Sequence, residues 1–301
     1  MEITTSFCNR SLNISEQSAV KASLTEVRLN ENFKSTRFWG KIFGVHNDYL
    51  IIEATSITHQ IQHKYFFSVD GGLRFAQLPI VEPWMQPKCM KIASLFTGIT
   101  SFVYADKKKK SENETDEEDE DKKANQAEEE EEEVEEDANG ENKDDPDAAD
   151  EPPEIEQKLT ELDRVAWTIS KINQECYIVP KNSILLTSSK LMQRNVNFSG
   201  LSRNDANKLE SYLHFRTPQS AYSVSKYRKA TAMNDTDFLD AITEDVPNGC
   251  WKLKAKKSGL EISIKNLLWN GFEFKYSAGE TQYIQSYFGY GIRQNDLVFM
   301  I

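Results

Sequence analysis

The histidines offer the first place to look for metal or acid–base chemistry. The chain has four of them, and His59 and His63 are four positions apart. On a helix this spacing places two imidazoles on one face, as in zinc metalloproteases whose general base is a Glu directly after the first His. Gln60 stands at that position, and Gln cannot act as a general base. With no third ligand nearby in the sequence, we expect a solvated loop or strand face rather than a metal site.

The remaining reactive residues also lack partners at useful spacings. His46 falls in a predicted turn, and His214 falls at a predicted helix C-terminus, where the helix dipole favours it. The Gly289-Tyr290-Gly291 stretch has no third glycine, so a glycine-kinked strand is expected rather than a dinucleotide site. The cysteines form no close pair and are expected to be small buried hydrophobes in a reducing compartment: Cys8, Cys89, Cys176 and Cys250. The sequence predicts no catalytic, cofactor or metal site.

The charge is divided unevenly along the 301 residues. The net charge is −12, but residues 106–157 alone carry 26 acidic side chains against 7 lysines, a balance of −19 that leaves the other 249 residues at +7. This acidic insert has too few apolar residues to form a core and is predicted to be disordered. It is either a solvated, repelling spacer or a docking tail for a basic surface, such as the body of this chain. Thr115 before three acidic residues also fits an acidophilic kinase site.

Several classes of function are excluded by composition. No apolar run approaches the roughly 18–20 residues that cross a bilayer, and the N-terminus has neither the basic start nor the apolar stretch of a signal peptide. We therefore expect a soluble, intracellular protein without membrane contacts. Outside two short runs, 107–110 and 252–257, the basic residues are scattered, which argues against nucleic-acid binding.

The first hundred residues predict one helix followed by hairpins. Asn13 can cap a helix over 15–33, with Glu16 in the capping-box position. The remaining expected elements are a hairpin of 38–45 and 49–53 around a turn at 46–48, a second hairpin of 64–69 and 73–76 around 70–72, a short helix within 84–105 and a strand at 99–104.

The residues after the insert predict helices first and strands last. The expected elements are an apolar helical stripe from Leu159 to Ile169, a strand at 177–179, a helix capped by Ser202 with a stripe reaching Leu213, a short helix from Asp235 through Ile242, and alternating strands at 251–255, 260–264 and 272–276. The fold class is therefore α+β, with antiparallel β hairpins and sheet, several separate helices and a long disordered acidic loop. We expect 1–105 and 158–301 to be two halves of one body.

Several motifs in register resemble the radial spoke head protein 9 family. Phe38-Trp39-Gly40-Lys41-Ile42-Phe43-Gly44 resembles the opening hairpin of radial spoke head proteins, and Ser211-Tyr212-Leu213-His214-Phe215-Arg216-Thr217-Pro218 and Leu267-Leu268-Trp269-Asn270-Gly271-Phe272 are similar to later motifs. The likeness covers about 10–104 and 155–301. It departs from the family at 96–102, where Phe-Thr-Gly-Ile-Thr-Ser-Phe replaces a Phe-x-Gly-Asp-Pro-Ser-Tyr-like stretch, and in the length of the acidic insert.

The resemblance implies a non-enzymatic structural subunit of the radial spoke head in the axoneme of motile cilia and flagella. Its partners would be other radial spoke head proteins, including longer related head subunits, with transient contacts to the central apparatus. It would relay mechanical signals between the central apparatus and the dynein arms. The alternative is an acidic-tailed binding or escort protein for basic protein partners, in which the insert does the binding.

Aromatic residues are the candidate interface anchors, because aromatic side chains supply much of the energy of buried interfaces. Any one of them can equally be part of the core. The candidates are Phe38, Trp39, Trp269, Phe272, Tyr287 and Phe288.

Overall fold

The computed structural model describes residues 12–30, 33–57, 61–104, 158–229 and 236–299. The acidic insert, with Thr115, therefore lies outside the described residues, as do Cys8 and His59. The description below concerns the body formed by the described residues up to Tyr104 and from Leu159 onward.

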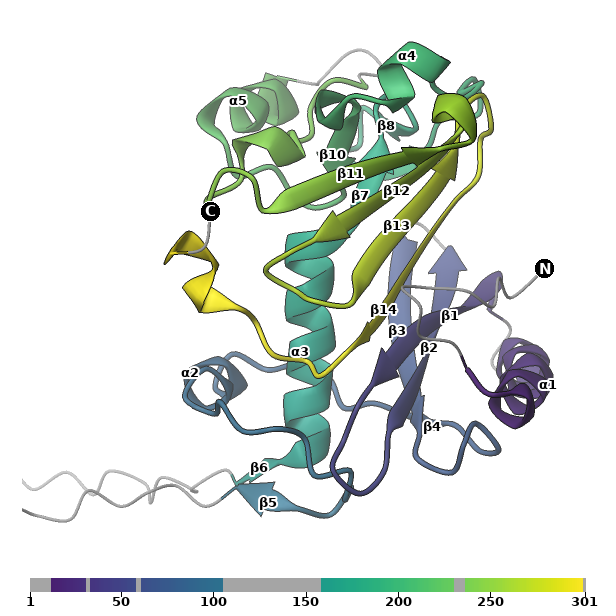
Figure 1. The fold of residues 1–301 in the computed structure, drawn as a ribbon, viewed down its shortest axis with the longest axis vertical. Coiled ribbons are helices and arrows are strands. Elements are labelled where there is room, and N and C mark those ends of the chain that lie inside the picture. Colours follow the sequence, from purple (N-terminus) through teal and green to yellow (C-terminus); the bar gives the residue numbers. More distant parts are fainter. Residues whose placement is uncertain (1–11, 31–32, 58–60, 105–157, 230–235, 300–301) are drawn as a thin grey trace, which may run out of the picture. The chain divides into compact units, whose positions relative to one another are not determined.

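An eight-stranded sheet runs through this body (Figure 1). Its strands, in spatial order, are β11 (Trp251–Lys256), β12 (Glu261–Asn266), β13 (Phe272–Ser277), β14 (Tyr283–Gly289), β1 (Ser35–Ile42), β2 (Tyr49–Ile57), β3 (Ile61–Ser68) and β4 (Ala76–Gln77). Every neighbouring pair is antiparallel except β1 and β14, which are parallel. Strands from before and after the insert thus belong to one hydrogen-bonded sheet.

The parallel junction depends on a very close approach of two backbones. Gly40 pairs with Tyr287, and a Cβ added to Gly40 would lie 2.1 Å from the carbonyl oxygen of Tyr287. Only glycine fits at that distance. The register of β1 against β2 also shifts between Phe38 and Gly40, which bends β1 at the junction.

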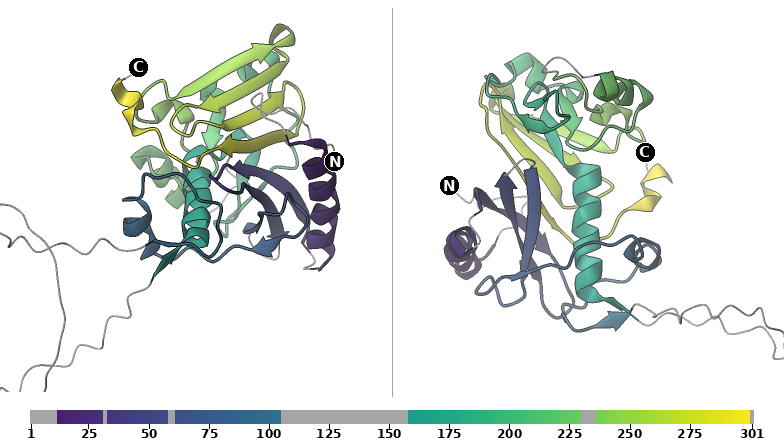
Figure 2. Two further views of the ribbon diagram at one scale, coloured as in Figure 1. Left: turned by 60° about the horizontal axis from the view of Figure 1, so that its bottom comes forward. Right: turned by 180° about the vertical axis from the view of Figure 1, so that it is seen from behind.

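Two long helices cover opposite faces of β1–β3 (Figure 2). Helix α1 (Ile14–Asn30) begins with the predicted capping box, in which Asn13 and Glu16 exchange main-chain-to-side-chain hydrogen bonds of 2.7 and 3.0 Å. Helix α3 (Glu161–Cys176) begins with a second capping box between Thr160 and Asp163, and its apolar stripe packs into the largest core cluster.

The smaller elements complete the body. They are α2 (Met85–Cys89), α4 (Arg203–Ala206), α5 (Ala221–Lys229), short 3-10 helices at Leu209–Ser211, Ile242–Glu244, Lys257–Gly259 and Asn295–Phe299, and three two-stranded sheets pairing β5 (Val103–Tyr104) with β6 (Leu159–Thr160), β7 (Ile178–Pro180) with β10 (Tyr212–His214), and β8 (Ile184–Leu186) with β9 (Met192–Arg194).

Most of the predicted elements are confirmed. The fold is α+β, the helices near 15–33 and 159–169 are present, the first hairpin turns at 46–48, and the three alternating runs at the C-terminal end are strands. The second predicted hairpin is only partly present, because β4 contains two residues and the main partner of β3 is β2.

One predicted helix is shorter than expected, and another is wrong. The helix capped by Ser202 is present but ends at Ala206, and Leu213 lies in β10, where pairing with Val179 replaces the expected helical contact. The region from Thr236 to Ala241 is not helical; Ile242–Glu244 forms one 3-10 turn. Helix α5 and strand β14 were not predicted.

Candidate functional site

Five of the six aromatic candidates have buried side chains. Trp39, Trp269, Phe272, Tyr287 and Phe288 are buried, and Phe38 is half-buried. Across the junction the rings pair, with centroid distances of 5.6 Å between Trp39 and Tyr287 and 5.9 Å between Phe38 and Phe288. Trp39, Tyr287 and Phe288 therefore pack at the β1–β14 junction, and Trp269 and Phe272 pack at the start of β13. Phe38 remains partly accessible.

A buried ion pair lies beside this junction. Glu53 on β2 is 1 % exposed and pairs with Arg37 directly across the β1–β2 ladder. His63 Nδ1 lies 2.7 Å from the same carboxylate, and the Tyr65 hydroxyl donates to it at 3.2 Å. Burial alone would raise the pKa of Glu53, but the Arg37 guanidinium and His63 outweigh it and hold the pKa at about 2. The carboxylate is therefore charged and fixes β1, β2 and β3 to one another.

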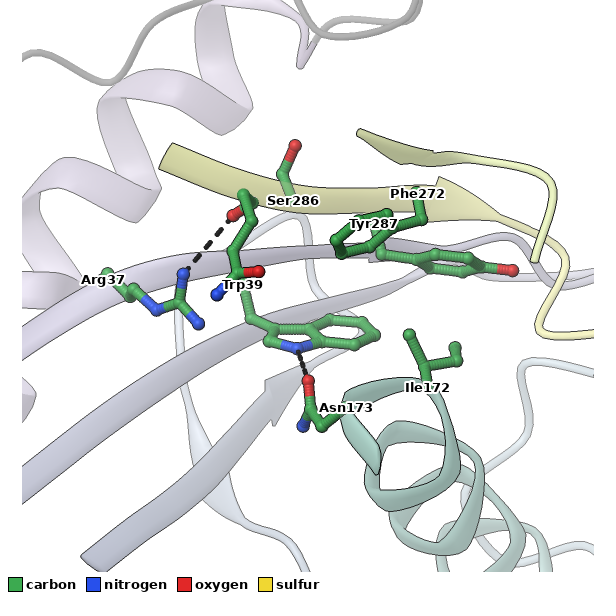
Figure 3. A pocket seen from close by; sticks show the side chains of 8 residues that line it. Arg37, Trp39, Ile172, Asn173, Phe272, Ser286 and Tyr287 are labelled. Atoms are coloured by element: carbon green, nitrogen blue, oxygen red, sulfur yellow. Dashed lines mark hydrogen bonds between the residues drawn. The ribbon is translucent and has the colours of Figure 1, made fainter. Parts of the chain in front are cut away.

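Asn173 connects this cluster to α3 (Figure 3). The Trp39 indole N–H donates to Asn173 Oδ1 at 2.8 Å, and Asn173 Nδ2 donates to the Tyr65 hydroxyl at 2.9 Å. The cavity among these side chains has a volume of only about 10 Å³. Ligand sites usually have volumes of several hundred Å³, so this cluster is a structural junction rather than a binding site.

A second, larger cavity also borders Asn173. It has a volume of about 280 Å³ and forms an open groove between β3, the segment after β4 and one face of α3. The groove is lined by His63, Lys64, Tyr65, Gln77, Leu78, Pro79, Ile80, Val81, Ala166, Ser170 and Asn173. We call this the β3 groove. Ile80 among the lining residues is 78 % exposed and adds apolar surface to the groove.

The main chain of β3 is open beside the groove. β4 pairs only with Phe66 and Phe67, and the next hydrogen bond, from the Leu78 N–H to the Tyr65 carbonyl, measures 2.9 Å. After Pro79 the segment leaves the strand, and among the described residues no further main-chain bond reaches β3 from it. Groove and open edge together make the clearest candidate binding surface on the described body.

The root of the acidic insert is held by a different buried cluster. Glu161, at the start of α3, is fully buried and accepts hydrogen bonds from Thr97 and Gly98, the shortest from the Thr97 hydroxyl at 2.6 Å and the Gly98 N–H at 2.7 Å. The Tyr49 hydroxyl donates to it at 2.8 Å, and burial together with this carboxylate raises the pKa of Tyr49. The Thr97–Gly98 segment thus wraps the Glu161 carboxylate.

Arg164 completes that cluster. It lies one turn after Glu161, donates to the Tyr104 hydroxyl at 2.7 Å, and lies 4.1 Å from the centre of the Phe96 ring. β5 and β6 pair directly beside it, with Val103 opposite Thr160. The two ends of the body that flank the insert are therefore fixed side by side.

His214, Cys89 and Cys250 lie in surroundings that are typical of residues that stabilise a fold. His214 is not at a helix end as predicted but in β10, buried, with Nε2 at 2.8 and 2.9 Å from the two oxygens of Asp245. Asp245 also accepts from the Trp251 indole at 2.7 Å. Burial raises the pKa of the Cys89 and Cys250 thiols to about 11, so both are protonated and unreactive at neutral pH.

Within the described ranges, no group of three or more His, Cys, Asp or Glu side chains comes together in a way that could hold a metal ion. Nor does any helix there combine the length and apolar composition needed to span a bilayer.

Comparison with known proteins decides the family. The profile of the family described as radial spokehead-like protein matches residues 3–182. The chain belongs to the radial spokehead-like family. Curated relatives named radial spoke head protein 9 homolog extend the likeness over nearly the whole chain: that of Danio rerio is 27 % identical over 290 residues, covering 96 % of this chain and 93 % of the relative. Those of Bos taurus and Homo sapiens are each 25 % identical over 285 residues, covering 95 % and 91 %.

Membership in the radial spokehead-like family gives the protein its place in the cell. The family is a structural one, not an enzyme family, and its members are parts of a multi-subunit spoke head in the axoneme of cilia and flagella. The protein is therefore a structural, axonemal component of the radial spoke. In such a component the functional site is the surface that contacts neighbouring subunits.

Proposed function

We propose that this protein is a non-enzymatic scaffold subunit that binds other spoke head subunits, including longer related ones. In this role it relays mechanical load between the central apparatus and the dynein arms, and it supports both assembly and movement of the cilium. The observation that carries the proposal is family membership combined with a likeness that spans almost the full length of the relatives.

The construction of the body supports a load-bearing role. We propose that residues 1–105 and 158–301 act mechanically as one unit, because β1 and β14 share one hydrogen-bonded ladder. The ion pair of Arg37 with the buried Glu53 and the Trp39–Asn173 hydrogen bond reinforce the sheet and α3 at that ladder. A force applied at one end of the sheet is then resisted by main-chain bonds rather than by a hinge.

The six aromatic candidates enter this proposal through packing. With five of them buried, they stabilise the body that presents the binding surface, and partner contact is assigned to exposed groups instead.

The test is a rescue experiment in ciliated cells that lack the endogenous protein. A tagged full-length chain should enter axonemes, restore the spoke heads seen by electron tomography and restore beating. A chain that stays out of axonemes while spoke heads form normally would contradict the proposal.

A second variant separates the alternative function from this one. If the protein is an escort for basic partners that acts through its acidic insert, deleting residues 106–157 abolishes its role. The scaffold proposal expects this deletion variant to assemble into axonemes at the wild-type level, and a failure to assemble would favour the escort function.

A further inference from the structure

We propose that the open edge of β3 binds an extended segment of another spoke head subunit, which adds to the sheet as a strand and inserts one apolar side chain into the β3 groove. This inference rests on the proposed function and specifies the kind of contact through which assembly takes place.

The direction of the main-chain groups supports strand addition. Main-chain N–H and C=O groups point to alternate sides along a strand, and the Tyr65 carbonyl points away from β2, toward Leu78. By this alternation the peptide groups of His63 and Ile61 also point outward, beyond the end of the two-residue ladder with β4. They present donors and acceptors about 7 Å apart along the edge, which is the spacing that an added peptide strand uses.

β4 pairs with β3 in this way, but only over two residues. In the β3–β4 register, Phe67 faces Ala76 and Phe66 faces Gln77. Continuing this register would place Ile80 opposite His63, but the chain turns away after Pro79 and leaves Ile80 exposed. A strand from outside can therefore take the place that this segment vacates, without displacing any described strand.

The groove defines the chemistry of the inserted side chain. An engineered cavity of about 150 Å³ accommodates benzene, so the 280 Å³ here is large enough for a leucine or phenylalanine side chain. The walls contributed by Leu78, Ile80 and Ala166 are apolar. The polar floor is already satisfied, since Asn173 donates to Tyr65 and Tyr65 donates to Glu53. The fitting residue is therefore apolar, on the strand face that points toward α3.

Charge near the groove does not oppose such a strand. Lys64 borders the groove, but its ammonium group lies away from it, with Nζ 5.6 Å from the centre of the Phe33 ring. His63 points toward the groove side but is held by Glu53 at 2.7 Å. An incoming apolar residue thus meets no charged group that it would have to strip of its partners.

Three variants of the full chain test the proposal in the rescue experiment. His63→Pro removes an outward-pointing N–H, and Ser170→Trp fills the groove from an exposed position on α3. Ala255→Pro makes the matched change on β11. The Cys250 carbonyl accepts from the Leu267 N–H just outside the β11–β12 ladder, so by alternation the N–H of Ala255 points away from β12.

The expected result is a loss of about tenfold in axonemal incorporation for His63→Pro and Ser170→Trp, measured by quantitative mass spectrometry, with Ala255→Pro near the wild-type level. Thermal melting of each purified variant shows whether it folds. If His63→Pro is unfolded, Ser170→Trp still decides. Wild-type incorporation of Ser170→Trp would overturn the proposal while leaving the scaffold function intact, whereas failure of the wild-type chain to enter axonemes would overturn the scaffold function itself.

A photo-crosslinker placed at position 170 identifies the occupant. The proposal expects a cross-link to one segment of another spoke head subunit, and a synthetic peptide of that segment should bind the wild-type protein about tenfold more tightly than His63→Pro. A cross-link within the same chain, a cross-link to a second copy, or no cross-link in assembled spoke heads would each overturn it.

Discussion

The two edges of the eight-stranded sheet are built in different ways. At one edge, β11 presents three exposed lysines, Lys252, Lys254 and Lys256, at alternate positions on one face. At the other, β4 covers only two residues of β3 and leaves an open main chain beside an apolar groove. Lysines on an edge strand discourage other strands from pairing with it. The comparison indicates a sheet that is closed to strand addition at β11 and open to it at β3.

The two edges also differ in how the nearby buried carboxylates are paired. Near the open edge, Glu53 is paired with the Arg37 guanidinium and two further hydrogen-bonding side chains. Near the lysine-bearing edge, Glu273 on β13 accepts a 2.6 Å bond from Ser263, while Lys265 and Lys275 approach from solvent at 3.9 and 3.7 Å. The open edge is therefore supported by the stronger buried electrostatic cluster.

The largest expected change in stability comes from removing one of these two carboxylates. Glu53→Ala leaves the half-buried Arg37 guanidinium without its carboxylate and should lower the free energy of unfolding by about 3 kcal/mol. Glu273→Ala should cost only about 1 kcal/mol, because its lysine partners are already solvated. Urea unfolding of the two variants measures both values. Equal losses in the free energy of unfolding would show that the two carboxylates stabilise the fold equally.

The pH dependence of stability should also follow Glu53. Its pKa is about 2 in the folded protein and about 4.3 in an unfolded chain, so its stabilising contribution is complete above pH 4.5 and is lost as the pH falls toward 2. The free energies of unfolding of the wild type and of Glu53→Gln should differ by on the order of 3 kcal/mol at pH 7. That difference should shrink between pH 4.5 and 2, and a difference that stays constant with pH would contradict this assignment.

A smaller effect is expected from the hydrogen bond that links the sheet to α3. Trp39→Phe removes the donor to Asn173 and should cost about 1 kcal/mol. Because Asn173 also holds Tyr65, amide hydrogen exchange in β3 should become faster. Trp84→Phe makes the same chemical change at an exposed bond to Glu82 and serves as the control. If amide exchange in β3 is unchanged, the hydrogen bond from Trp39 does not stabilise the strand that borders the groove.

The smallest change in stability should accompany the clearest change in association. Replacing Lys252, Lys254 and Lys256 by Thr should alter the free energy of unfolding by no more than about 0.5 kcal/mol. It should nevertheless promote self-association through β11, visible in sedimentation velocity. The matched replacement by Arg keeps the charges and should remain dissociated. If the Thr variant also stays dissociated, the lysines do not protect this edge.

Local patterns predicted the regular parts of the fold well. The alternation in 251–255 and 272–276 identified β11 and β13, and the Asn13–Glu16 pair identified the start of α1, because both signals are contained within a few residues. Leu209 and Leu213 mimicked a helical stripe, but Tyr212–His214 pairs with β7, a contact far away in sequence. Helix α5 was missed because its described residues bury only Ser223, which leaves no apolar stripe to detect.

Local sequence patterns could not predict the candidate site. The groove exists because β3 extends beyond the end of its pairing with β4, and because α3, about ninety residues later in the chain, supplies the opposite wall. Pro79 was the one available signal, since a proline after a short β-prone run indicates where pairing stops. The aromatic candidates could be named from the sequence, but the burial of Trp39 and Tyr287 depends on the parallel pairing of β1 with β14, two strands far apart in the chain.

High-resolution electron microscopy of isolated spoke heads containing this protein tests the central claim most directly. The account predicts that the eight-stranded sheet continues beyond β3 into a strand of another subunit, with an apolar side chain in the β3 groove, while β11 faces solvent. Spoke heads in which the β3 edge is bare, or in which a neighbouring strand pairs with β11 instead, would contradict it.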